Sequence, residues 1–84
     1  MSIEYSKLPN NTECYQEDES GNCIKIRFAY QGEKNGAVTV KDDVFDADPQ
    51  KPFDNYTEEE LDAMYDDAIA IGLKTRVDQT LAEV

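Results

Sequence analysis

The stretch CIKIRFAYQGEKNGAVTVK, residues 23–41, decides the fold class of this 84-residue chain. Its first part places large apolar side chains at every second position: Ile24, Ile26, Phe28 and Tyr30. Such alternation in β-branched and aromatic residues is typical of a strand with one buried face. The pair Asn35-Gly36 then predicts a tight hairpin turn, because both residues tolerate positive φ angles. Residues 37–41 alternate again, and we expect Val38 and Val40 to face the core.

The region before this hairpin is less regular. Residues 12–17 form a candidate strand, which ends at a polar run, residues 17–22, that is typical of a turn. Residues 1–11 show little pattern apart from a turn signal at Pro9-Asn10-Asn11, so we expect weak order there. The sequence thus predicts an antiparallel sheet of about three strands.

After the hairpin comes an acidic segment, residues 42–55. It contains Pro49 and Pro52 and has no usable periodicity, so the sequence predicts a loop. Three apolar residues within it are expected to hold this loop against the core: Val44, Phe45 and Phe53.

A helix start follows at Glu58. Thr57 and Glu60 have the spacing of a capping box, in which each side chain accepts a hydrogen bond from the other residue's backbone amide. Tyr56 and Leu61 occupy the two positions of a hydrophobic staple. Acidic residues in the first turn also favour a helix start, because they lie at the positive end of the helix dipole.

The helical region, residues 58–83, carries two apolar stripes. The first contains Leu61, Met64, Tyr65, Ala68, Ile71 and Gly72, whereas the second contains Ile69, Leu73, Val77 and Val84 and lies well over 90° around the helix, at about 100° per residue. We therefore expect a break near Gly72, which gives helices over 58–71 and 76–83. The alternative is an unbroken helix whose last turns contact a partner or a second copy.

These elements predict one α+β domain over residues 1–84, because the chain is too short for two. In this arrangement the apolar face of the three-stranded sheet packs against the first stripe of the helix. The contacting side chains are expected to be Ile24, Ile26, Phe28, Val38 and Val40 from the sheet, and Leu61, Met64, Tyr65 and Ala68 from the helix.

The composition excludes most catalytic and cofactor chemistry. The chain has no histidine, so it lacks an imidazole base, a Ser-His or Cys-His pair and a histidine metal ligand. Its four glycines are scattered, so no phosphate-binding loop is present. The run from Asp46 resembles the start of an EF-hand loop, but Lys51 and Thr57 stand where glycine and glutamate are needed. We predict a protein that is not an enzyme and that has neither metal nor cofactor.

The two cysteines, Cys14 and Cys23, flank the predicted first turn. No apolar run is long enough for a membrane span, and the N-terminus has no signal-peptide pattern, so the expected compartment is the cytoplasm. Thiols stay reduced there, which favours two free cysteines. A hairpin would nevertheless place them opposite each other, and a disulfide remains the alternative.

Charge is the main functional signal. The formal net charge is −11, and the window from Asp42 to Asp67 holds eleven of the nineteen acidic residues with only one base, Lys51. Direct nucleic-acid binding is disfavoured, because it needs clustered Lys and Arg. We expect a partner protein with a basic surface instead.

The sequence thus favours a non-enzymatic acidic protein that occupies a basic, nucleic-acid-binding site on its partner, in the manner of a phage-type inhibitor. The phage attribution rests on an analogy in size and charge. One helix stripe is too sparse to imitate duplex DNA, unless the acidic loop shares its surface. The candidate binding residues are Asp42, Asp43, Asp46, Asp48, Glu59, Asp62 and Asp66.

Three alternatives remain at this point. The acidic face could serve solubility alone. The protein could instead be a structural or assembly subunit, with a homo-oligomer or hetero-oligomer contact through Leu73, Val77 and Leu81. It could also be an accessory subunit that completes the site of an enzyme.

Overall fold

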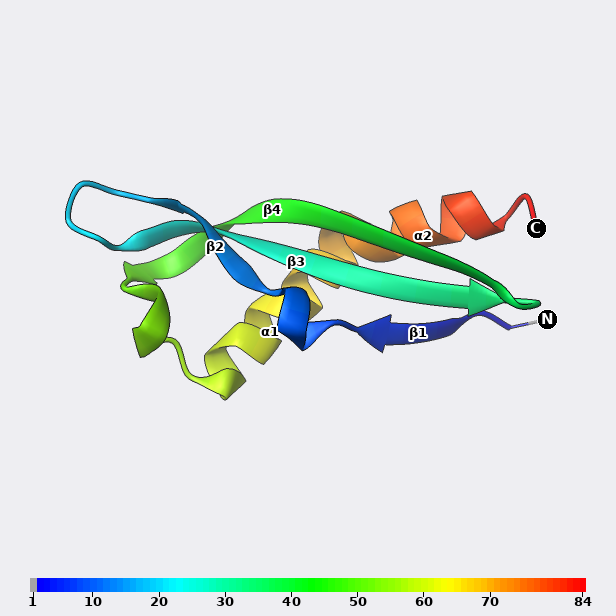
Figure 1. Cartoon of the computed structure of the whole chain (residues 1–84), viewed down its shortest axis with the longest axis horizontal. Coiled ribbons are helices and arrows are strands. Elements are labelled where there is room, and N and C mark those ends of the chain that lie inside the picture. Colours follow the sequence, from blue (N-terminus) through cyan, green and yellow to red (C-terminus); the bar gives the residue numbers. More distant parts are fainter. Residues whose placement is uncertain (1) are drawn as a thin grey trace.

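A four-stranded antiparallel sheet and a C-terminal helix of 24 residues make up the computed structural model, which describes residues 2–84 (Figure 1). The predicted α+β class is confirmed. The sheet has one strand more than the three that the sequence predicts. Its strands are β1 (Glu4–Lys7), β2 (Glu13–Glu17), β3 (Cys23–Lys34) and β4 (Ala37–Lys51).

Strand β3 lies at the centre of the sheet. It pairs with β4 along one edge, while β1 and β2 share the other edge end to end. A short 3-10 turn, η1 (Pro9–Asn11), separates β1 from β2. The expectation of weak order in residues 1–11 is therefore wrong for Glu4–Lys7 and Pro9–Asn11, which form β1 and η1; Met1 is outside the described residues.

The hairpin turn forms as predicted, with φ angles of 54° at Asn35 and 83° at Gly36. It sets the register that places Gly32 opposite Thr39, so these two residues share the face that packs on the helix. Val38 and Val40 consequently point to the other face and remain 56% and 49% exposed. The prediction that these valines face the core is wrong, because the two-residue turn pairs odd-numbered residues of β4 with the even-numbered, core-facing residues of β3.

The predicted acidic loop over 42–55 is also wrong for most of its length. Strand β4 continues to Lys51, which lies opposite Cys23, and only then does a second 3-10 turn follow, η2 (Phe53–Asn55). Pro49 is tolerated because the pairing is irregular after Asp46, and because β4 is an edge strand whose outer side needs no amide donors.

The helical region is continuous. It consists of α1 (Glu58–Ala68), a π-helical turn η3 (Ile69–Leu73) and α2 (Lys74–Leu81). The predicted capping box is present, with the Glu60 amide donating to Thr57 Oγ1 over 3.1 Å and the Thr57 amide donating to Glu60 Oε1 over 3.1 Å. The predicted break at Gly72 is wrong, and the alternative of an unbroken helix is correct.

The π turn resolves the conflict between the two apolar stripes. A π turn inserts an extra residue, which rotates the following residues by about 100° and returns the second stripe to the sheet. Leu73, Val77 and Leu81 are accordingly fully buried in the same core as Ile26 and Phe28. They are not available for an oligomer contact, so the predicted contact through these three residues is wrong.

The helix approaches the sheet most closely at Gly32. A Cβ atom at this position would collide with Val77 and would lie 3.0 Å from Leu81 Cδ1. No side chain fits between β3 and α2 here, which explains the glycine in the central strand.

Cys14 and Cys23 form a disulfide, with their Cα atoms 6.0 Å apart. The prediction of two free thiols is therefore wrong. Pairing of β2 with β3 brings the two cysteines within disulfide range. The bond fastens β2 to the centre of the sheet.

The helix covers one face of the sheet, and the molecule is elongated, with extents of 46 × 20 × 18 Å (Figure 1). No other described element covers the opposite face, which we call the open face; it carries Lys25, Arg27, Val38 and Val40. Within residues 2–84, none of the helices has both the length and the apolar character needed to cross a membrane.

Candidate functional site

The charge of the molecule is concentrated at one end of its long axis. Residues 13–26 and 44–64 contain eleven acids and two bases, which gives a net charge of −9, whereas the rest of the chain contributes only −2. The register places these two segments together, because β2 and the C-terminal part of β4 both pair with the first half of β3. The start of α1 lies at the same end, on the left in Figure 1. We call this region the acidic end.

The predicted binding residues do not form one surface. Asp42 and Asp46 lie opposite Ala29 and Lys25, so their side chains share the open face of the sheet. The helix that carries the other acids covers the opposite face. Asp42 and Asp46 therefore do not share a surface with the helix acids, which the imitation of duplex DNA would need. The acidic end contains Asp46, Asp48, Glu59 and Asp62, whereas Asp42, Asp43 and Asp66 lie outside it.

Several of these carboxylates already have a cation within the chain. Asp46 pairs with Lys25 at 3.2 Å and Asp43 pairs with Arg76 at 3.2 Å. Asp62 and Asp66 share one cation, Lys7. Lys7 Nζ lies 2.8 Å from Asp62 Oδ1 and 2.7 Å from Asp66 Oδ1. Exposed pairs of this kind contribute little to stability, but they reduce the charge that is left for a partner.

The amine of Lys7 shows how this face of α1 holds a cation. Hydrogen bonds to Asp62 and then Asp66 raise the pKa of Lys7 above its ordinary value, because both carboxylates favour the charged amine. The same amine lies 5.7 Å from the centre of the Tyr65 ring, which adds a cation–π contact. Two carboxylates and an aromatic ring therefore form a working ammonium site next to the acidic end.

Glu58 and Glu59, in the first turn of α1, have no ion-pair partner among residues 2–84. The third glutamate of this turn differs, because Glu60 binds Lys51 at 2.6 Å, and this contact and the cap lower the pKa of Glu60. Asp48 and Asp54 also lack a cation in the described part of the chain. Part of the charge that has no ion-pair partner thus lies around the helix start.

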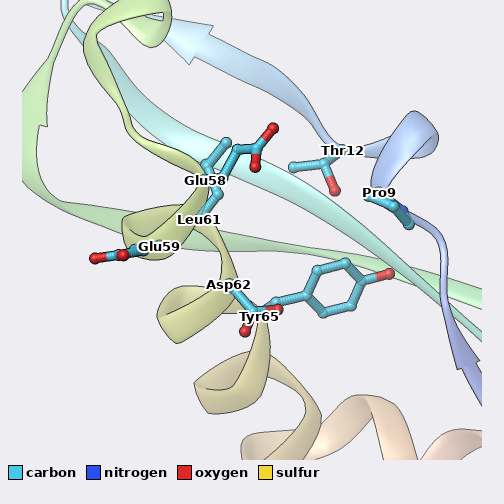
Figure 2. Close-up of a pocket in the computed structure, with 7 residues that line it drawn as sticks. All are labelled: Pro9, Thr12, Glu58, Glu59, Leu61, Asp62 and Tyr65. Carbon is cyan, nitrogen blue, oxygen red and sulfur yellow. The ribbon is translucent and has the colours of Figure 1, made fainter.

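A cleft of about 510 Å³ opens beside this helix turn, between α1 and η1 (Figure 2). It combines an acidic rim with an apolar floor. Its lining residues are Pro9, Thr12, Glu58, Glu59, Leu61, Asp62 and Tyr65. In Figure 2 the Glu58 carboxylate extends toward Thr12 across the cleft, whereas Glu59 points away from it.

The walls of this cleft are held by the core. The Tyr65 hydroxyl accepts a hydrogen bond from the Leu8 amide at 2.6 Å, and its ring packs on Phe28 with 5.0 Å between centroids. Burial raises the pKa of Tyr65, so the phenol stays neutral. On the facing wall, the buried Thr12 hydroxyl has no hydrogen-bond partner among the described residues.

The sequence identifies only part of this site. Glu59 and Asp62 are among the predicted residues, but Glu58, Thr12 and Tyr65 are not. The position of Glu58 in the first helical turn is explained by the helix dipole, so its charge gives no sign of a binding role. Thr12 reaches the cleft only because η1 and β2 lie on the same sheet edge, which no local pattern in the sequence indicates.

No group of three or more carboxylate or thiol side chains within residues 2–84 is placed to hold a metal ion. Comparison of the chain with protein-family models, curated proteins and solved structures found no match. A functional assignment therefore has to be argued from the charge and shape of the acidic end.

Proposed function

We propose that this chain is a non-enzymatic acidic binding protein, whose acidic end occupies a basic site on a partner protein. The observation that carries the proposal is the uncompensated charge of Glu58 and Glu59 at the rim of a cleft with an apolar floor. A surface that served only solubility would not need that charge beside a cleft. The absence of histidine from the sequence supports a binding role over a catalytic one.

The cleft fits a lysine or arginine side chain of the partner. Such a side chain buries an aliphatic stem and keeps its charged head at a polar edge. Leu61 and Pro9 would receive the stem, while Glu58 would bind the head through a charge-assisted hydrogen bond. The Lys7 site on the same helix shows that a cation is held by this combination of carboxylate and aromatic groups.

The mechanism is occlusion with electrostatic steering. A net charge of −9 at one end of an elongated molecule orients it toward a basic surface and accelerates encounter. The sharper form of the proposal is an inhibitor, of the phage type, that competes with nucleic acid for such a surface. This form needs only a shared basic site and does not require the carboxylates to reproduce the spacing of phosphates.

The disulfide bears on where this encounter takes place. Disulfides persist in oxidising compartments and are rare in the cytoplasm. The bond between Cys14 and Cys23 therefore favours an oxidising setting over the cytoplasm that the sequence predicts, and such a setting supports the general form of the proposal over the form that competes with nucleic acid.

The proposal is tested by calorimetric titration with a short oligo-arginine peptide as the probe. The double variant Glu58→Gln/Glu59→Gln removes the two uncompensated charges at the cleft without changing side-chain size. We expect it to weaken binding about fivefold to tenfold, which corresponds to about 1 kcal/mol. Binding of the unaltered protein should also weaken steeply as salt is added, because screening shortens the reach of the exposed charges.

The matched control is Glu33→Gln/Glu83→Gln, which makes the same change in net charge at the other end of the molecule. Both control residues are exposed. We expect the control to bind the peptide nearly as tightly as the unaltered protein. An equal loss in both double variants would refute the proposal, because it would show that only net charge matters.

A further inference from the structure

The backbone groups of β4, an edge strand, point alternately toward β3 and outward from the sheet. The two-residue turn makes Lys34 and Ala37 a hydrogen-bonded pair, so odd-numbered residues from Ala37 onward direct their backbone groups toward β3. The even-numbered residues direct theirs outward. Two side-chain contacts agree with this alternation, because they reach the outward carbonyl of Asp42 and the outward amide of Val44.

These contacts occupy the outward backbone groups in the middle of β4. Arg76 Nη1 donates to the Asp42 carbonyl at 2.7 Å, and the Val44 amide donates to the Asp43 carboxylate at 2.8 Å. Charged side chains and proline occupy the rest of β4 beyond this point, which is how edge strands avoid unwanted pairing. The protected stretch therefore begins at Asp42.

Residues 37–40 have no such protection, and the first charged side chain after them is that of Lys41. The outward amides and carbonyls of Val38 and Val40 have no hydrogen-bond partner among the described residues, and both side chains are exposed on the open face. A segment with free backbone groups and apolar side chains at alternate positions is suited to pairing with another strand.

We propose that this segment pairs with the same segment of a second copy of the chain. In an antiparallel pairing with the two-fold axis at Thr39, Val38 lies opposite Val40 of the second copy, and Val40 lies opposite its Val38. Each of these two pairs exchanges two main-chain hydrogen bonds. The four valines then form one apolar cluster on the continuous open face, and the two threonines form a favourable cross-strand pair.

The position of the edge favours a second copy as the occupant. Residues 37–41 lie outside the acidic end, in the part of the molecule that carries a net charge of only −2. Antiparallel pairing there places the two acidic ends at opposite poles of the dimer, where their repulsion is smallest. Pairing cannot slide further along β4, because Arg76 already occupies the Asp42 carbonyl. The pairing is thereby confined to residues 37–41, of which Thr39 is the midpoint.

Sedimentation equilibrium over a range of concentrations tests the proposal. A contact this short belongs to the weak class of interfaces, so the range should extend to about 1 mM. We expect a monomer–dimer equilibrium. The double variant Val38→Lys/Val40→Lys opposes like charges across the pair and should raise the dissociation constant at least about tenfold. The matched control is Ile71→Lys/Val84→Lys, two exposed apolar residues away from the edge, which should leave the equilibrium unchanged.

Amide hydrogen exchange provides an independent readout on the unaltered protein. Protection of the Val38 and Val40 amides should rise with protein concentration, while the Thr39 and Lys41 amides, already bonded to β3, should be protected throughout. A monomer at every concentration would overturn the proposal and leave the edge to a strand of a different protein. A dimer that survives in Val38→Lys/Val40→Lys would overturn it as well.

Discussion

At the scale of single residues, two glycines differ in whether packing requires them. Gly32 lies in the central strand, where α2 comes so close that no Cβ atom fits. Gly72 lies in the π turn, and a Cβ atom added there meets no atom within 4 Å. Only the first glycine is therefore required by the fold.

The two glycines should respond in opposite ways to alanine. Gly32→Ala overpacks the contact with Val77 and should lower the free energy of unfolding by about 1–3 kcal/mol. Gly72→Ala should raise it by about 0.5–1 kcal/mol, because alanine loses less backbone entropy in a helix. Urea denaturation of both variants measures these changes. Loss of stability in Gly72→Ala would show that the helix needs glycine at the π turn.

At the scale of elements, local signals predict the beginnings of elements better than their extents. The capping box at Thr57 and the hairpin at Asn35-Gly36 are each contained in a few residues, and both are present in the structure. The extent of β4 is different, because it depends on pairing with β3 rather than on its own pattern. Asp42 and Asp46 lie on the open face, whereas Asp43 lies on the helix side and pairs with Arg76, so the strand has no apolar alternation that the sequence could reveal.

The helix shows the same limit. The sequence shows that the apolar stripe changes face near Gly72. A π turn and a helix break would both account for this change. The sheet below the helix decides between them, because continuous burial of Leu73 and Val77 requires the π turn. Only Glu59 and Asp62 of the candidate site are predictable from the sequence, since its other wall comes from η1 and Thr12, which are far away in sequence.

The disulfide provides a test at this scale. It joins edge strand β2 to β3 and closes a short loop, with a sequence separation of 9 between its cysteines. The variant Cys14→Ala/Cys23→Ala should lower the free energy of unfolding by about 2–3 kcal/mol, because the open loop gives the unfolded chain more conformational freedom. Urea denaturation of the variant and of the chemically reduced protein should agree. Unchanged stability in both would mean that β2 is held by strand pairing alone.

At the scale of the whole molecule, the two proposals use different ends. The acidic end carries most of the net charge and the cleft, whereas the hairpin end carries the unprotected edge of β4 (Figure 1). If both proposals hold, a dimer would present two acidic ends at its poles. Such a dimer could engage two basic sites at once, and the second contact would then form at a raised effective concentration.

The central claim is that the cleft beside the first turn of α1 receives a basic side chain, and nuclear magnetic resonance tests it most directly. Backbone and methyl signals would be followed while a short oligo-arginine peptide is added at low salt. We predict that the largest shifts fall on Thr12, Glu58 and Leu61 around the cleft, with little change at Glu33 and Glu83. Shifts spread evenly over all acidic residues, or greatest at the hairpin end, would contradict the claim.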